Sequence, residues 1–230
     1  MKPGKDNFEA WNEEHANKHD LEKFYNHPNR VFRFIENKRI RKLIQTAEIE
    51  PHHKVLEVGC GAGHILEKIP HGKLTGVDIS SIQVQRAAKR LGSKAEIIKA
   101  AGEDLPFPDE SFDRILCTEV FEHVLEPDAL LAEMKRTLAS DGIISLSIPN
   151  ENLIIFTKKV LLNCGLRRVL EPKESNWDLA AKNNLDEWHI HNYSLKLMKQ
   201  QAGKYFKINN IQRIPYFFIP FRYVMKLQHK

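Results

Sequence analysis

The sequence predicts a doubly wound α/β fold, in which a mostly parallel, seven-stranded, Rossmann-like sheet carries helices on both faces. Between residues 54 and 148, short apolar stretches alternate with stretches of helical periodicity, as expected for strands joined by crossover helices. The first apolar stretch runs into a glycine-rich turn, and Asp78 ends the second. Glycine lets a ligand approach the backbone, and a carboxylate after the next strand can accept hydrogen bonds from ribose, so the pattern indicates a nucleoside site.

The individual elements follow from this periodicity and from the residues at their ends. Residues 8–46 are predicted to be helical with a break at 26–29, where a proline interrupts the pattern. Ser80 and Pro127 are typical of helix starts, and Gly203 is typical of a helix end. The predicted strands are 54–58, 73–78, 95–99, 112–117 and 143–148, followed by an antiparallel edge pair at 206–214 and 216–224. The other predicted helices are 63–69, 81–91, 127–139, 153–162 and 194–202.

A length of 230 residues predicts a single domain over residues 1–230, or one domain with small additions. The expected parts of this domain are a helical lid at 1–50, a cofactor-binding core at 51–150, an inserted helical or loop segment that caps the substrate at 151–190, and a C-terminal helix with edge strands at 191–230.

Composition excludes several classes of protein. No stretch reaches the ~18 consecutive apolar residues of a membrane span, and the first residues lack the apolar core of a signal peptide. The three cysteines form no disulfide framework, and we interpret Cys60 and Cys117 as buried apolar fillers, which predicts a cytoplasmic protein.

The net charge of +5 is unevenly distributed, since residues 158–230 hold fourteen Lys and Arg against five Asp and Glu. Such a basic region could attract nucleic acid, an anionic lipid surface or an anionic substrate, or it could be an ordinary solvated surface.

The glycine spacing helps to distinguish a dinucleotide from other nucleoside cofactors. A dinucleotide site uses G-x-G-x-x-G around a pyrophosphate, whereas this turn has Gly59, Gly61 and Gly63, with Glu57 two residues before the first glycine. A carboxylate at that position would repel a pyrophosphate but suit a cation. S-adenosylmethionine carries two cationic groups, an ammonium and a sulfonium.

In five segments the chain resembles the class I S-adenosylmethionine-dependent methyltransferases: E-x-G-x-G-x-G at 57–63, G-V-D-I-S at 76–80, E-D-L-P-F at 103–107, S-F-D at 111–113 and L-A-S-D-G at 138–142. The resemblance implies S-adenosyl-L-methionine as cofactor, S-adenosyl-L-homocysteine as product, ribose binding by Asp78 and adenine packing by Ile79. Ala101 departs from the family, in which an acidic residue often meets the adenine amino group there. The implied cofactor contacts are Glu57, Gly59, Cys60, Gly61, Gly63, Asp78, Ile79, Gly102, Glu103 and Thr118.

A second candidate site follows the fourth strand. On a helical turn, Glu119, Glu122 and His123 would share one face, where two carboxylates and an imidazole could bind a divalent metal ion. The segment resembles the E-x-x-E-H of small-RNA 2′-O-methyltransferases and of ubiquinone-pathway O-methyltransferases. The RNA enzymes complete a metal site with a downstream histidine, and His189 falls at about the matching position. Alternatively, no metal is bound, Glu119 faces the cofactor, and His123 or His189 acts as a general base.

We therefore expect methyl transfer from S-adenosyl-L-methionine to an oxygen of a small-molecule or lipid-linked acceptor, with His123, His189 and Glu119 as catalytic candidates. Metal-dependent RNA 2′-O-methylation and a non-catalytic cofactor-binding module are the alternatives. Residues 214–223 are rich in Tyr and Phe and are either two edge strands bounded by prolines or an exposed aromatic surface for a lipid-like substrate or peripheral contact with a bilayer.

Overall fold

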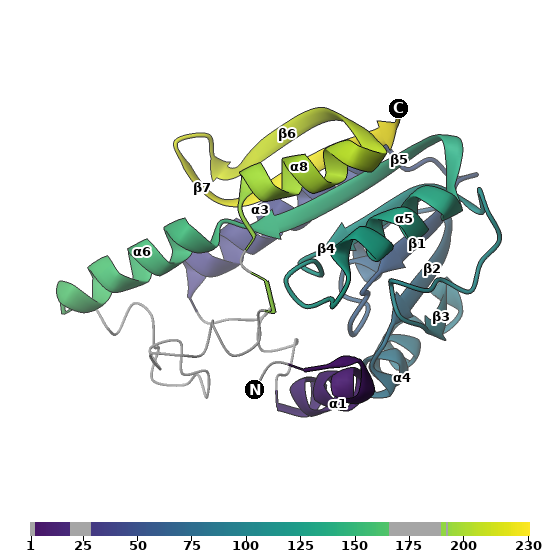
Figure 1. The fold of residues 1–230 in the computed structure, drawn as a ribbon, viewed down its shortest axis with the longest axis horizontal. Helices are drawn as coiled ribbons and strands as arrows, with labels where there is room; N and C mark the ends of the chain where they lie inside the picture. Colours follow the sequence, from purple (N-terminus) through teal and green to yellow (C-terminus); the bar gives the residue numbers. More distant parts are fainter. Residues whose placement is uncertain (1–2, 19–28, 166–189, 192) are drawn as a thin grey trace.

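The computed structural model describes residues 3–18, 29–165, 190–191 and 193–230. The described strands are β1 (Lys54–Val58), β2 (Lys73–Asp78), β3 (Ala95–Lys99), β4 (Phe112–Thr118), β5 (Leu138–Pro149), β6 (Phe206–Tyr216) and β7 (Ile219–His229). They form one seven-stranded sheet in the order β3-β2-β1-β4-β5-β7-β6 (Figure 1). Strands β1 to β5 are parallel, whereas β7 is antiparallel to both β5 and β6. The predicted fold class is confirmed.

Helices cover both faces of the sheet. The described helices are α1 (Phe8–Lys18), α3 (Arg30–Ala47), α4 (Ser81–Leu91), α5 (Pro127–Thr137), α6 (Glu151–Asn163) and α8 (Leu195–Tyr205), with 3₁₀ turns at Lys5–Asn7, Leu66–Lys68 and Gly92–Lys94. α3 and α4 share one buried cluster with the sheet, and α5 and α8 share the other. Because successive strand residues point to opposite faces, Val55 packs in the first cluster and Leu56 in the second.

Local sequence explains where several helices begin. The Ser80 hydroxyl accepts a hydrogen bond from the Gln83 N–H at the start of α4, and the Ser194 hydroxyl accepts one from the Leu197 N–H at the start of α8. Pro127 occupies the first turn of α5. Backbone N–H groups of that turn have no intrahelical acceptor, so a proline, which lacks the N–H, is tolerated there. The helix starts predicted at Ser80 and Pro127 are therefore present.

Several predicted boundaries differ from the structure, among them the last strand, which was expected over 216–224 and is Ile219–His229. The helix expected over 63–69 is only a 3₁₀ turn at Leu66–Lys68, because Gly63 has a φ of 79° and leaves the helical region. The helix expected to end near Gly203 continues to Tyr205, since its last turn is anchored by buried Ala202 and Phe206. β5 begins at Leu138, where a register shift lets this residue pair with β4, and α5 consequently ends at Thr137.

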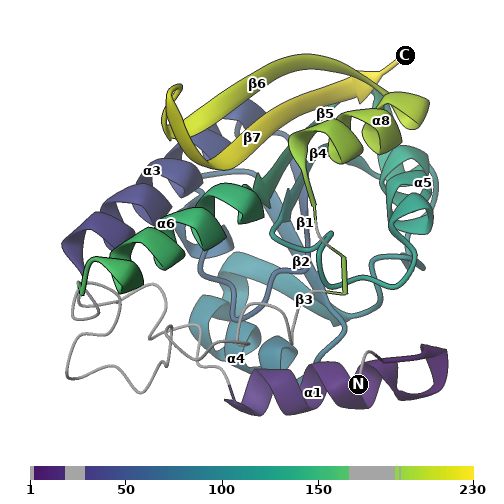
Figure 2. The same ribbon diagram turned by 60° about the vertical axis from the view of Figure 1, so that its left-hand side comes forward.

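The two described helices of the predicted N-terminal lid lie in different places. α3 lies on the sheet, where Leu43 and Ala47 are fully buried, so it belongs to the core. α1 instead lies beside α4 at the β3 side of the sheet, in both views (Figures 1 and 2). Of the predicted insertion at 151–190, the structure describes α6, whereas residues 166–189 lie outside the described residues. Among the helices described, none combines the length and apolarity that crossing a membrane requires.

Candidate active site

The glycine turn after β1 has a backbone shape that glycine adopts readily and other residues do not. Gly59, Gly61 and Gly63 have φ values of 69°, 51° and 79°, in the left-handed region. Gly59 is further constrained by its surroundings, because a Cβ atom there would lie 2.4 Å from Cγ2 of Val120. The turn is thus in direct contact with the loop that follows β4.

Glu57 lies on β1, two residues before this turn, and only 1% of it is exposed. Its Oε2 atom is buried and has no hydrogen-bond partner among the described residues. Burial raises the pKa of Glu57 to about 8, against the opposing effects of a Leu66 backbone hydrogen bond and the positive charge of Arg39. An unsatisfied buried carboxylate oxygen is costly, and a cationic ligand group beside it would offset that cost.

Asp78 ends β2 and faces the same turn. Its Oδ2 accepts a hydrogen bond from the Gly61 N–H at 2.8 Å, and its Oδ1 accepts one from the Ser80 N–H at 2.9 Å. The buried Cys60 donates its N–H to the Val77 carbonyl at 2.9 Å, which fixes the turn beside the strand. Burial raises the pKa of Asp78 although both hydrogen bonds oppose the rise. Each carboxylate oxygen keeps a second lone pair that a ligand hydroxyl could use.

The sheet brings two further predicted residues to this edge. β1 pairs with β2 on one side and with β4 on the other, so Asp78 and Thr118 lie on opposite sides of the glycine turn. The Thr118 hydroxyl is buried and finds no hydrogen-bond partner in the described part of the chain. Ile79 is half-buried and follows Asp78 directly. Buried groups that bond to none of the described residues therefore lie at the ends of both β1 and β4.

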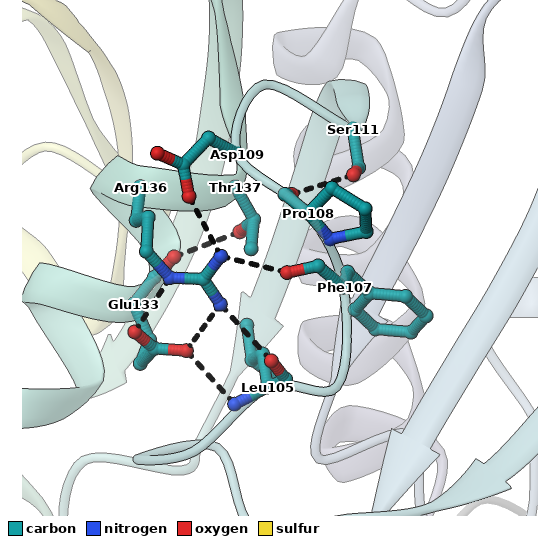
Figure 3. A network of polar contacts seen from close by, with 8 residues as sticks. All are labelled: Leu105, Phe107, Pro108, Asp109, Ser111, Glu133, Arg136 and Thr137. Carbon is teal, nitrogen blue, oxygen red and sulfur yellow. Dashed lines mark hydrogen bonds and ion pairs between the residues drawn. The ribbon is translucent and has the colours of Figure 1, made fainter.

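The loop between β3 and β4 carries Gly102 and Glu103. Glu103 Oε1 accepts a hydrogen bond from the Leu125 N–H at 3.2 Å, so this carboxylate is engaged with the loop after β4. Farther along, the Arg136 guanidinium donates to the Leu105 and Phe107 carbonyls and pairs with Glu133 and Asp109 (Figure 3). Arg136 thereby fastens the loop to α5, and it positions the segment that holds Gly102 and Glu103.

Glu119 differs from the sequence-based prediction. Its φ of 53° is left-handed, so the predicted helical turn through Glu119, Glu122 and His123 does not include Glu119. The Glu119 carboxylate instead lies 3.0 Å from Arg222 Nε through Oε2 and accepts a hydrogen bond from the Ser147 hydroxyl at 3.0 Å through Oε1. The shared face that the metal hypothesis requires is therefore not formed.

This ion-pair network extends into the core. Arg222 Nη2 lies 3.3 Å from Glu36 Oε1, and Arg39 Nε donates to Glu36 Oε2 at 2.8 Å. Arg39 also donates to the Ser147 hydroxyl at 3.2 Å. Burial raises the pKa of Glu36, but the charges of Arg39 and Arg222 outweigh it and hold that pKa below its usual value. Two arginines thus neutralise two glutamates, Glu36 and Glu119, where α3, β5 and β7 meet.

The other predicted metal ligands are not gathered into a centre. In the part of the chain that the structure describes, no group of three His, Cys, Asp or Glu side chains could hold a metal ion. Glu122 is buried, and His123 is half-buried with its backbone N–H bonded to the Val120 carbonyl. His189, the fourth predicted ligand, lies outside the described residues. The metal hypothesis therefore gains no support from these residues.

His191 is a candidate that the sequence analysis missed. Its Nε2 is buried without a hydrogen-bond partner among the described residues, and its backbone N–H donates to the Glu122 carbonyl at 3.3 Å. Its ring lies 6.1 Å from that of Tyr193, which lies 5.8 Å from that of Phe121. These contacts hold His191 against the loop after β4. The sequence signal for His191 is its place two residues after His189.

Glu13 on α1 was also missed. Its Oε2 accepts a hydrogen bond from the Ser80 hydroxyl at 2.8 Å, and its Oε1 accepts one from the Ser81 N–H. Burial raises the pKa of Glu13, but these hydrogen bonds outweigh burial and lower it overall. α1 is therefore bound to the start of α4, two residues beyond Asp78.

The strand order and the glycine turn define a class I methyltransferase fold. Residues 56–146 match the family of methyltransferase domains. Over these residues the chain is similar to methyltransferase domains, as the five sequence segments predicted.

Comparison with individual proteins extends this result. The chain is 31% identical over 135 residues to the ubiquinone biosynthesis O-methyltransferase of Pasteurella multocida, which is 50% of this chain and 54% of that protein. It is 27% identical over 192 residues to the ubiquinone/menaquinone biosynthesis C-methyltransferase UbiE of Hahella chejuensis, covering 74% and 76% of the two chains. The chain spans about half the length of the first curated relatives it matches.

A solved structure supports the fold over nearly the whole chain. It is a complex of the Trm112 methyltransferase activator with a methyltransferase of Haloferax volcanii. The match has a TM-score of 0.65 at 14% identity and covers 96% of this chain and 97% of that one. The likeness therefore extends beyond the central strands to the flanking elements.

Proposed function

We propose that the chain binds S-adenosyl-L-methionine at the carboxyl ends of β1 and β2 and methylates an oxygen of a lipid-like small molecule. The observation that carries the proposal is the acidic pair on either side of the glycine turn. Glu57 has a buried oxygen without a partner among the described residues, and Asp78 accepts a hydrogen bond from the Gly61 N–H of the same turn. A cofactor with a cationic amino-acid end and a ribose fits both groups.

The residues present fit this cofactor in chemical terms. Bound there, the cofactor would supply a methyl group on an electrophilic sulfonium. Glu57 would accept hydrogen bonds from its ammonium group, and Asp78 would accept them from its ribose hydroxyls. The Thr118 hydroxyl, also without a partner in the described residues, could bond to the ligand at the end of β4. Methyl transfer needs mainly correct placement, so the chain's chief task would be to orient donor and acceptor.

An acceptor hydroxyl must lose its proton, and the described candidates for the base are His123 and His191. Both lie in or against the loop after β4, and His191 Nε2 has no partner among the described residues. His189 remains a further candidate of the same segment. Two relatives named for ubiquinone biosynthesis support a lipid-like acceptor, and one of them is named an O-methyltransferase. The names of the relatives differ in the methylated atom, so the choice of oxygen rests on the histidines.

The RNA alternative depends on a metal ion held by Glu119, Glu122, His123 and His189. Because both Glu119 oxygens already contact Arg222 or Ser147, the described residues favour the metal-free proposal. The expected activity is therefore insensitive to EDTA.

Replacing Asp78 by alanine tests the ribose assignment. We expect weaker binding of S-adenosyl-L-methionine by about 1–3 kcal/mol, the range for losing a buried hydrogen-bond partner. The same loss is expected for 5′-methylthioadenosine, which keeps the ribose but lacks the amino-acid end. Isothermal titration calorimetry measures both ligands, and Asp141→Ala, at an exposed carboxylate on β5, serves as the matched control. Unchanged binding of 5′-methylthioadenosine by a folded Asp78→Ala protein would refute the assignment.

A further inference from the structure

The turn between β6 and β7 exposes four large apolar side chains in succession. The exposed fractions are 47% for Tyr216, 78% for Phe217, 64% for Phe218 and 41% for Ile219. Tyr216 pairs with Ile219 across the hairpin, so Phe217 and Phe218 form its tip. The Phe218 ring stacks on Tyr216 and meets Phe217 edge to face, which leaves the rings together on the outside. A contiguous apolar patch of this kind typically marks a binding surface.

Two helices adjoin the hairpin and carry further exposed apolar side chains. Lys38 Nζ on α3 lies 4.5 Å from the centre of the Tyr216 ring and 5.7 Å from that of Phe34, so α3 adjoins the hairpin. α6 is linked to the start of β7, because the Asn150 side chain donates to the Pro220 carbonyl at 2.8 Å. Both views show α3, α6 and the hairpin turn on one side of the molecule (Figures 1 and 2). Further exposed apolar side chains on the helices are Val31, Phe34, Phe156 and Val160.

The patch lies at the same end of the sheet as the candidate active site. Pro149, the last residue of β5, pairs with Arg222, and the hairpin continues beyond that pair to its tip. The carboxyl end of β5 is the end at which parallel strands β1, β2 and β4 lead into Gly59, Asp78 and Thr118. The apolar tip therefore projects past the edge of the sheet where an acceptor would enter.

Among the described residues, the charged side chains on α3, α6 and β6 are mostly basic. α3 contributes Arg30, Arg33, Lys38 and Arg41, α6 contributes Lys158 and Lys159, and β6 contributes Arg213. The acidic side chains of these three elements are Glu36, which is paired with Arg39 and Arg222, and Glu151, which is buried. Aromatic side chains flanked by lysine and arginine suit the interface of an anionic bilayer, where rings enter the headgroup region and cations meet lipid phosphates.

We propose that this surface, comprising Tyr216 to Ile219, Val31, Phe34, Phe156 and Val160 with their basic neighbours, binds an anionic lipid bilayer. Phe217 and Phe218 enter the headgroup region, and Lys38 contacts lipid phosphate. The charge of the surroundings favours a bilayer over a second copy of this chain, because two copies would bring like charges together. The inference does not depend on methyl transfer, since it concerns the hairpin and helices rather than the glycine turn.

Vesicle co-sedimentation tests the proposal with three variants. The full chain is expected to bind vesicles made of equal parts phosphatidylglycerol and phosphatidylcholine, and to bind phosphatidylcholine alone weakly. Phe217→Ser/Phe218→Ser should lower binding about tenfold or more, because two phenylalanine side chains no longer leave water. Lys38→Glu should also weaken binding, whereas Lys207→Glu, an exposed lysine at the other end of β6, should not.

Three results would overturn the proposal. The first is that the wild type does not bind anionic vesicles. The second is that the wild type and the double serine variant bind them equally. The third is that the wild type is a dimer, the double serine variant is a monomer, and neither binds vesicles. Both substituted phenylalanines are exposed, so the melting temperature should be unchanged. Calorimetry with S-adenosyl-L-methionine on the same variants should be unchanged too, which separates a failure of this surface from a failure of the proposed function.

Discussion

Replacing Arg39 by methionine is expected to lower the free energy of unfolding by about 3–5 kcal/mol, the usual effect of removing one partner of a buried ion pair. Arg39 is 1% exposed and donates to Glu36 at 2.8 Å and to Ser147 at 3.2 Å. Methionine fills much of the same volume, so the loss would come from the uncompensated Glu36 carboxylate rather than from a cavity. Because Arg222 also lies 3.3 Å from Glu36 and would still compensate part of its charge, we expect a loss at the lower end of that range. Urea unfolding at neutral pH measures the change.

The matched control for this prediction is Arg41→Met, which removes the same charge from an exposed position of the same helix. It should change stability by less than about 0.5 kcal/mol. The pH dependence provides a second check, because the pKa of Glu36 is held below its ordinary value of 4.5. Its contribution is present above that ordinary value and is lost as the pH falls through the lower folded-state pKa. Equal losses for Arg39→Met and Arg41→Met would show that the buried pair is unimportant.

Replacing Gly59 by alanine is expected to destabilise the protein by about 2–4 kcal/mol and to weaken cofactor binding, since strain and overlap act together. The strain comes from the φ of 69°, and the overlap from the new Cβ atom, which would lie 2.4 Å from Val120 Cγ2. Relief of the overlap must move either the turn or the loop after β4, and both adjoin the candidate site. Thermal unfolding and calorimetry with S-adenosyl-L-methionine measure the two effects.

Two further variants separate strain from overlap. Gly92→Ala also has a positive φ, of 53°, but no atom lies within 4 Å of the new Cβ, so it should show strain without overlap, about 1–3 kcal/mol. Adding Val120→Ala to Gly59→Ala removes the colliding methyl groups and should restore part of the lost stability. No restoration by Val120→Ala would contradict the overlap as a cause.

The sequence predicted those features of the fold and the site that depend on residues close together in the chain. The apolar runs predicted the parallel strands, and the glycine spacing with Glu57 predicted the shape of the turn. Ser80 and Pro127 predicted two helix starts, because capping depends on residues one turn away. Asp78 was predicted to share one nucleoside site with the glycine turn, and its carboxylate accepts a hydrogen bond from the Gly61 N–H of that turn.

The missed features depend on contacts between distant parts of the chain. Glu119 was expected on a helical turn, but Ser147 on β5 and Arg222 on β7 hold its carboxylate, and no local pattern contains those partners. Glu13 reaches Ser80 across 67 positions of sequence. For the same reason, the aromatic run at 214–223 left two alternatives open. In the structure it forms the turn of the β6–β7 hairpin, in which β6 alone is the edge strand, and the tip of the hairpin is exposed.

The most direct test of the central claim, that the Glu57 carboxylate binds the cationic end of the cofactor, is calorimetry at several pH values. The pKa of about 8 means that Glu57 is mostly protonated below that pH, so ammonium binding must displace a proton. We predict that the affinity for S-adenosyl-L-methionine rises as the pH approaches 8, by up to about tenfold per unit, and that Glu57→Gln abolishes this rise. The affinity for 5′-methylthioadenosine, which lacks the ammonium, should depend little on pH in either protein. A wild type that binds S-adenosyl-L-methionine with the same pH dependence as Glu57→Gln, or that binds neither ligand, would contradict the account.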